Sequence, residues 1–232
     1  MQGNIRIVGS ADCEYSSDAK SFYKGYWSQG ESISSFTRTK NQNILDHYFP
    51  DEIKNKCIVE LGVGGEGGMI VHLKDTNQVF GIDASGSAAQ NCKQLGVEVI
   101  ELNIDASKLP FDGDSVDIVF GFEVFEHLSS PQFVIEEVYR ILKKYGVLLL
   151  TTPNPLIHHW PRLFYLQRYE KKSFREFLMI NKFNIREQAN IGSNMYSKRG
   201  YGNIDEAWSW TWYCNKIGAD QADVLFKYGR YF

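Results

Sequence analysis

The sequence predicts an α/β fold built on a mostly parallel sheet of seven strands. The chain has 232 residues, 43% hydrophobic and 23% charged, which is the composition of an ordinary globular protein. Between residues 57 and 152, short apolar runs alternate with amphipathic stretches. This alternation is typical of strands joined by right-handed helical crossovers, which produce a parallel sheet. Without a repeat or linker, we expect one domain over residues 1–232.

The first fifty residues are polar and mixed, and we expect them to form a helical cap (1–50). Residues 18–27 and 34–49 have helical character, and Pro50 marks a stop. The sheet should therefore begin after this segment.

Five strands are expected within residues 57–154. They cover residues 57–61, 78–82, 97–102, 116–122 and 147–150. Ser85 is placed to cap a helix through Leu95, and Gly96 lies at its C-terminal exit.

A second helix of this segment is expected from Ser130 through Lys144. Ser130 is a good N-cap, and Pro131 suits the first turn. Apolar side chains recur at i, i+4, i+7 and i+8, counted from Val134. One face of this helix should therefore pack inward. We expect Gly146 to end this helix.

Beyond Pro153 the pattern is less regular. The residues Ser-Phe-Arg-Glu at 173–176 form a capping box, which predicts the start of a short helix. Two further strands are expected at 183–188 and 222–228. The segment 190–221 between them is long for a plain connection, and such segments are commonly functional.

Composition excludes several classes of protein. The net charge of −3 argues against a surface that coats nucleic acid. No apolar run is long enough to span a membrane, and no basic leader precedes an apolar core. The four cysteines, at positions 13, 57, 92 and 214, contain no C-x-x-C pair. We therefore expect a cytoplasmic protein with free thiols and no metal site.

The strongest chemical signal is the glycine cluster V-E-L-G-V-G-G-E-G-G at residues 59–68. After a buried strand, such a turn lets backbone N–H groups approach a ligand, and a helix should follow. Asp83, about 20 residues further on, ends the next strand, where a carboxylate can bind both hydroxyls of a ribose. Together they predict a nucleoside-containing ligand. A tight turn without a ligand and a helix N-cap at Asp83 are the structural alternatives.

Three more motifs follow in order. They are N-I-D-A-S-K-L-P-F at 103–111, D-I-V-F-G-F-E-V-F-E-H at 117–127 and L-K-K-Y-G-V-L-L-L-T-T-P-N at 142–154. In this order the chain resembles the class I S-adenosylmethionine-dependent methyltransferases, in particular the small-molecule branch typified by ubiquinone and lipopolysaccharide-sugar methylating enzymes. The resemblance is close over 57–154 and looser over 173–228.

The resemblance implies a Rossmann-like sheet with helices on both faces and the last strand antiparallel. It also implies that residues 57–154 bind S-adenosylmethionine and that residues 155–232 form the acceptor-side half, with a lid at 190–221. The expected reaction is methyl transfer to a small molecule, with a sugar or ring oxygen favoured.

The methionine portion of the cofactor is expected at the glycine loop. The resemblance places Glu60 near the ammonium group, with backbone contacts at Gly62 and Gly64. The family pattern E-x-G-x-G-x-G is broken here by Glu66, so a shifted loop could bind through Gly65 and Gly67.

The adenosine portion is expected to lie across the next two strands. By the same resemblance, Asp83 binds the ribose, and Asp105 accepts a hydrogen bond from the adenine amino group. The other residues expected to contact the cofactor are Ala84, Ala106, Phe122 and Glu123.

An oxygen acceptor needs a base to remove its proton, most plausibly a histidine. His127 follows the fourth strand, and His158 and His159 follow the fifth. We favour His127 because of its place near the expected cleft; a merely hydrogen-bonded or solvent-facing histidine is the alternative.

Two features hint at the acceptor. Residues 196–213 contain six aromatic side chains, which suggests a pocket wall or lid, or else a sheet-edge cover or homodimer contact. Residues 162–186 carry seven Lys or Arg against two Glu, which suits a phosphate-bearing acceptor or simply a solvated helix face. No RNA-binding module is recognised.

Two other functions remain open from the sequence. A nicotinamide-dependent oxidoreductase would use the same glycine loop and Asp83, but it leaves the segments 105–111 and 126–127 unexplained. A cofactor-binding regulator with weak catalysis is the non-enzymatic alternative.

Overall fold

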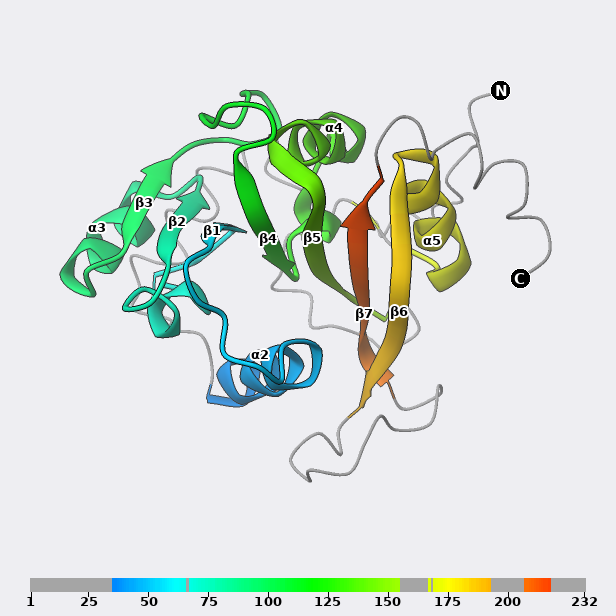
Figure 1. Ribbon diagram of the computed structural model, residues 1–232, viewed down its shortest axis with the longest axis horizontal. Helices are drawn as coiled ribbons and strands as arrows, with labels where there is room; N and C mark the ends of the chain where they lie inside the picture. Colours follow the sequence, from blue (N-terminus) through cyan, green and yellow to red (C-terminus); the bar gives the residue numbers. More distant parts are fainter. Residues whose placement is uncertain (1–34, 66, 155–166, 168, 193–206, 218–232) are drawn as a thin grey trace, which may run out of the picture.

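The computed structural model describes residues 35–65, 67–154, 167, 169–192 and 207–217. Seven strands form one sheet in the order β3-β2-β1-β4-β5-β7-β6, with β7 lying between β5 and β6 (Figure 1). The strands are β1 (Cys57–Leu61), β2 (Gln78–Asp83), β3 (Glu98–Glu101), β4 (Val116–Phe122), β5 (Leu142–Pro153), β6 (Phe183–Gly192) and β7 (Ala207–Lys216).

The sheet is mostly parallel. The neighbours from β3 through β5 pair in parallel, whereas β7 is antiparallel to both β5 and β6. The predicted seven strands, parallel core and antiparallel last strand are therefore confirmed. Because β1 to β5 run the same way, their carboxyl ends meet at one edge, where ligands of such sheets bind.

Helices cover both faces of the sheet. On one face, α2 (Ser35–Tyr48) and α3 (Gly86–Gln94) pack in a cluster with Ile58, Ile118 and Phe120. On the other, α4 (Pro131–Ile141) and α5 (Lys171–Ile180) pack in a cluster with Val59 and Val119. The alternation of these side chains along β1 and β4 places successive residues on opposite faces.

The two ends of α3 confirm the sequence prediction. The Ser85 hydroxyl accepts a hydrogen bond from the Ala88 amide at 3.4 Å, so Ser85 is the N-cap. Gly96 has a φ of +71° just beyond the helix, as a glycine C-terminal exit requires.

The prediction of a helix after the glycine cluster is wrong. Among its described residues, the connection to β2 contains only the short 3-10 helix η1 (Ile70–His72). The Asn77 side chain donates to the carbonyl oxygens of Leu73 and Ile53, at 3.0 and 2.8 Å. These bonds turn the chain directly into β2.

The predicted end of α4 is also wrong. The helix ends at Ile141 rather than Lys144, because Leu142 is already extended and pairs with Val116 of β4. A register shift follows this first pair, and Gly146 lies within β5 rather than ending the helix.

The capping box predicted at 173–176 does not begin α5. The helix starts at Lys171, after Glu170 as N-cap, and the Phe174 amide donates to the Glu170 carbonyl at 2.9 Å. The side chains of Phe174, Phe177 and Leu178 are buried and form the inward face of the helix.

The lid expected at 190–221 is corrected by β7. Residues 207–216 are a strand inside the sheet, and 190–192 belong to β6. The strand at 183–188 is confirmed and is longer, whereas the one expected at 222–228 lies outside the described residues, as does the helix at 18–27. The Trp–Ser–Trp–Thr–Trp alternation at 208–212 has the two-residue period of a strand, and this signal identifies β7.

Two further observations concern the described residues. None of their helices is long and apolar enough to cross a membrane. Their cysteines, Cys57, Cys92 and Cys214, are free thiols.

Candidate functional site

The glycine loop follows β1 at the carboxyl edge of the sheet. Gly62 and Gly64 both have left-handed backbone angles, with φ of +68° and +63°. Such angles are readily adopted only by glycine, which explains these residues at the turn. The Gly62 amide donates to the Ile82 carbonyl at 2.7 Å, so the loop is fixed against the end of β2.

Asp83 ties the glycine loop to the start of α3. Its Oδ2 accepts a hydrogen bond from the Gly64 amide and its Oδ1 one from the Ser85 amide, both at 2.9 Å. The side chain is buried, and burial raises the pKa of Asp83 above its ordinary value although both amide bonds oppose this shift. Each carboxylate oxygen still has a further lone pair that can accept a hydrogen bond from a hydroxyl group.

Glu60 is buried beneath the loop. Its Oε2 accepts hydrogen bonds from the amides of Met69 and Ile70, at 2.8 and 3.0 Å, and a Cβ at Gly68 would overlap its carboxylate. Burial raises the pKa of Glu60 to about 8. The structure thus gives Glu60 a role within the chain, which is to hold the loop after the glycines; contact with the cofactor ammonium stays a prediction.

Asp105 binds the start of α4. Its two carboxylate oxygens accept hydrogen bonds from the amides of Ser129 and Ser130, at 3.0 and 2.9 Å. Ser130 is the N-cap residue of α4, as predicted, but its side chain makes no capping bond. The Ala106 amide donates to the Asn103 carbonyl at 3.2 Å.

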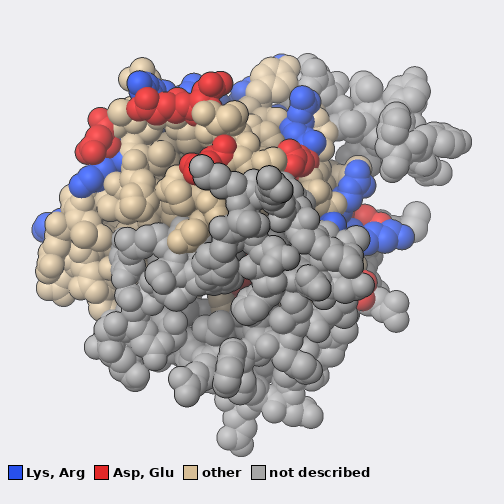
Figure 2. All heavy atoms as spheres, turned by 90° about the horizontal axis from the view of Figure 1, so that it is seen from below, with Lys and Arg blue, Asp and Glu red and all other residues tan. Residues whose placement is uncertain are grey.

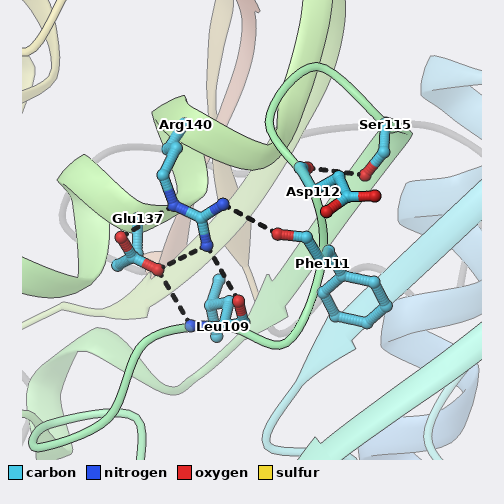
Figure 3. A network of polar contacts seen from close by, with 6 residues as sticks. All are labelled: Leu109, Phe111, Asp112, Ser115, Glu137 and Arg140. Carbon is cyan, nitrogen blue, oxygen red and sulfur yellow. Dashed lines mark hydrogen bonds and ion pairs between the residues drawn. The ribbon is translucent and has the colours of Figure 1, made fainter.

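An arginine fixes the rest of the loop that carries Asp105 (Figure 3). Arg140 of α4 donates to the carbonyl oxygens of Leu109 and Phe111, at 2.8 and 2.7 Å. It also forms an ion pair with Glu137, whose carboxylate accepts from the Leu109 amide at 2.9 Å. The bond with Arg140 lowers the pKa of Glu137, which keeps this carboxylate charged.

The turn after β4 carries strained backbone. Glu123 has a φ of +54°, which is unfavourable for a residue with a Cβ. Its amide donates to both the carbonyl and the hydroxyl of Thr151 on β5, at 3.1 and 2.9 Å. Phe122, just before it, is buried and stacks on Phe120. The sequence motif contains Thr151, but sequence reasoning missed that it holds this turn.

Comparison with known families identifies the segment. Residues 59–150 match the model of a family described as a methyltransferase domain. Over these residues the chain resembles that family of methyltransferase domains. This segment contains the glycine loop, Asp83, Asp105 and the turn at Glu123.

Two curated relatives match part of the chain. One, from Mycobacterium tuberculosis, is named "Probable S-adenosylmethionine-dependent methyltransferase" and is 31% identical over 99 residues, 42% of this chain and 35% of the relative. The other, the ubiquinone biosynthesis O-methyltransferase of Pelagibacter ubique, is 26% identical over 107 residues, 44% of each protein. The matched part therefore spans under half the length of either relative.

Solved structures share the fold over more of the chain. A chain of the complex between the Haloferax volcanii Trm112 methyltransferase activator and a methyltransferase has a TM-score of 0.68 at 19% identity, covering 87% of this chain and 98% of its own. An S-adenosylmethionine-dependent methyltransferase from Aquifex aeolicus has a TM-score of 0.65 at 16% identity, covering 84% and 98%. At these identities the likeness concerns the fold of the methyltransferase domain.

The histidine favoured as a base lies beside this domain's β4. His127 ends the 3-10 helix η2 (Phe125–His127), and 15% of its side chain is exposed. Its Nε2 lies 3.7 Å from a carboxylate oxygen of Glu126, which is fully buried. The other two histidines considered, His158 and His159, lie outside the described residues.

The remaining predicted contacts of the methyltransferase domain are less defined. Gly65 and Ala84 are partly buried next to Gly64 and Asp83, whereas Glu66 lies outside the described residues. Gly67 and Gly68 have left-handed backbone angles, with φ of +78° and +56°.

The described surface is mixed in charge. Figure 2 shows both Lys or Arg and Asp or Glu side chains on the described part of the face seen from below. Within the described ranges, no group of three or more His, Cys, Asp or Glu side chains could hold a metal ion.

Proposed function

We propose that the protein is an S-adenosylmethionine-dependent methyltransferase that acts on a small molecule, with the oxygen of a sugar or ring compound favoured. The observation that carries the proposal is the bond between the Gly64 amide and the Asp83 carboxylate, 2.9 Å long. It joins the glycine turn and the acidic strand end at the edge of the sheet where nucleoside ligands bind.

The residues at this edge fit the cofactor. Left-handed Gly62 and Gly64 leave the loop without side chains next to the ligand. The Asp83 carboxylate has further lone pairs that can accept hydrogen bonds from the ribose hydroxyls. The Asp105 carboxylate can accept one from the adenine amino group in the same way. When bound, S-adenosylmethionine supplies a methyl group on a positively charged sulfur, which an acceptor oxygen displaces in line.

The chain's own task is to orient the acceptor and exclude water. Orientation of two reactants can contribute roughly 7–11 kcal/mol to catalysis, and a dry site protects the activated methyl group. For an oxygen acceptor, His127 accepts the hydroxyl proton at a ring nitrogen. Glu126, 3.7 Å from that ring, then stabilises the charged imidazole.

An oxygen acceptor is favoured by the described site and by one relative. The only histidine of the described residues beside the carboxyl end of β4 is His127, and a nitrogen acceptor with a free amine would need no such base. The Pelagibacter ubique relative is named an O-methyltransferase. A phosphate-bearing acceptor and a homodimer stay predictions from the sequence.

Calorimetry tests the cofactor. We expect S-adenosylmethionine and its demethylated product S-adenosylhomocysteine to bind, and NAD not to bind. Binding of NAD in their place would contradict the proposal and favour an oxidoreductase.

Incubation with methyl-labelled S-adenosylmethionine and fractionated cell extract tests the reaction. We expect label in a small-molecule fraction with the wild type and a much lower amount with His127→Ala. Label confined to protein or RNA would contradict the acceptor class. Cofactor binding without any transfer would favour the regulator.

A further inference from the structure

Thr152 of β5 and Trp210 of β7 form a directly opposed pair in the sheet. Opposed residues of antiparallel strands point to the same face. Both are buried, with exposed fractions of 0% and 6%. Among the residues that the structure describes, neither the Thr152 Oγ1 nor the Trp210 Nε1 has a hydrogen-bond partner.

Buried polar atoms without a partner are uncommon, and here two of them belong to directly opposed residues. A buried polar group without a partner costs about 1–3 kcal/mol, and most are bonded to protein, water or a ligand. The indole N–H can only donate, whereas the hydroxyl can donate and accept. The pair therefore offers a two-point site for an oxygen atom.

The pair lies at the proposed active edge. Thr152 is next to the last residue of β5, at the carboxyl end of the parallel strands. Trp210 belongs to the same hydrophobic cluster as Phe125, which begins the η2 turn that ends at His127. The donors thus share a face of the sheet with the segment that carries the expected base.

We propose that Thr152 and Trp210 bind the methyl acceptor, and that this acceptor is an uncharged ring compound carrying a hydroxyl or carbonyl oxygen. The inference rests on the proposed function and specifies its substrate class. Neutral donors in a buried setting favour an uncharged oxygen, because a charge would be desolvated without a counter-charge. The indole of Trp210, edge-on to Trp212 at 6.1 Å between centroids, offers an apolar wall to a ring.

Trp212 provides an internal comparison. Its Nε1 also has no partner among the described residues, but it opposes Leu150 deeper in the sheet and packs on Phe174 at 4.6 Å between centroids. Trp212 is surrounded by core side chains, so we expect no ligand there. The substitution Trp212→Phe is therefore the matched control for Trp210→Phe.

Indole resonances in nuclear magnetic resonance spectra of the 15N-labelled full chain test the proposal. Phenol is the probe, toluene is the ring without oxygen, and S-adenosylhomocysteine is present at saturation. We expect phenol to shift the Trp210 indole resonance, identified by its loss in Trp210→Phe, and toluene to leave it in place. The Trp212 resonance should not move. Equal effects of phenol and toluene, or no response at Trp210, would overturn the proposal.

The variants distinguish binding from structure. We expect Thr152→Val and Trp210→Phe to weaken phenol binding about fivefold each, the size of one neutral hydrogen bond, and Thr152→Ser to retain it. Because the Thr152 hydroxyl lacks a partner among the described residues, Thr152→Val should not lower the Tm of the ligand-free protein, whereas Trp210→Phe should lower it through the lost volume of a buried ring. A lower Tm in Thr152→Val would show a structural role for the hydroxyl and overturn the inference. Loss of S-adenosylhomocysteine binding by the wild type would instead contradict the proposed function.

Discussion

Gly62 and Val124 are in direct contact across the paired strands β1 and β4. A Cβ placed on Gly62 would lie 2.7 Å from the Val124 Cγ2. Gly62 begins the glycine loop, and Val124 follows the strained turn at Glu123. The two loops at the carboxyl edge are therefore packed against each other at this point.

Substitution Gly62→Ala should lower the free energy of unfolding by about 2–5 kcal/mol. The left-handed angle costs a residue with a Cβ about 1–2 kcal/mol, and overpacking against Val124 adds about 1–3 kcal/mol. Urea denaturation measures the change. Adding Val124→Ala should recover the overpacking part only; if it recovers nothing, the contact does not limit this position.

Substitution Asp83→Ala should weaken S-adenosylhomocysteine binding by roughly 1.5–3 kcal/mol, the value of hydroxyl bonds to a charged acceptor. It also frees the amides of Gly64 and Ser85, so the loop loses its anchor. Calorimetry measures the affinity, with the exposed Asp75→Ala as control. Unchanged affinity in Asp83→Ala would mean that the ribose binds elsewhere.

Substitution Thr151→Val should weaken cofactor binding several-fold. It removes the hydroxyl that accepts the Glu123 amide at 2.9 Å but leaves the carbonyl bond, a loss of about 1 kcal/mol. Thr151→Ser keeps the hydroxyl and should behave as wild type. If both variants bind the cofactor equally well, the turn does not need this bond.

The pH dependence of stability should report Glu60. Its pKa is about 8 in the folded protein against an ordinary 4.5, so between these values the folded state holds a proton that the unfolded state has lost. The stability from this group is complete below pH 4.5 and is lost as pH rises through 8. Glu60→Gln cannot ionise, so its stability relative to wild type should rise between pH 5 and 8.

Urea denaturation at a series of pH values measures that difference, which reaches at most about 5 kcal/mol. The exposed Glu52→Gln serves as the control substitution. A flat difference for Glu60→Gln would mean that the buried carboxyl ionises normally.

Substitution Arg140→Ala should destabilise the protein by about 2–3 kcal/mol. It removes the bonds to the carbonyls of Leu109 and Phe111 and leaves Glu137 without its cation (Figure 3). Because Arg140 lowers the pKa of Glu137, the stability from that carboxylate is lost as pH falls through its folded-state pKa. In acid, the free energy of unfolding of Arg140→Ala should therefore fall less steeply with decreasing pH than that of wild type. Equal slopes for the two proteins would contradict this account.

Much of the fold followed from local pattern. The five core strands are short apolar runs between turn residues, and Ser85 and Gly96 bound α3 by their own chemistry. The predicted ends of helices and strands were less accurate, because pairing between strands decides where they lie. Leu142 has a sequence suited to a helix, yet it joins β5 since Val116 lies beside it.

The candidate site was predicted in its positions but not in its contacts. The motifs identified Glu60, Asp83 and Asp105, but each carboxylate also binds backbone amides that come close only in three dimensions. Thr151 illustrates the remaining difficulty, because its partner is the amide of Glu123 on another strand. A motif shows residue types, whereas these bonds depend on how the strands are paired.

The position of β7 has a consequence for how the chain folds during synthesis. Strand β6 is made before β7, yet the order of the sheet gives it β7 as neighbour and separates it from β5. Until residues 207–216 leave the ribosome, both β5 and β6 present an open edge, a template for pairing with other chains. A nascent chain stalled before that point should thus depend on chaperones far more than one released a few residues later.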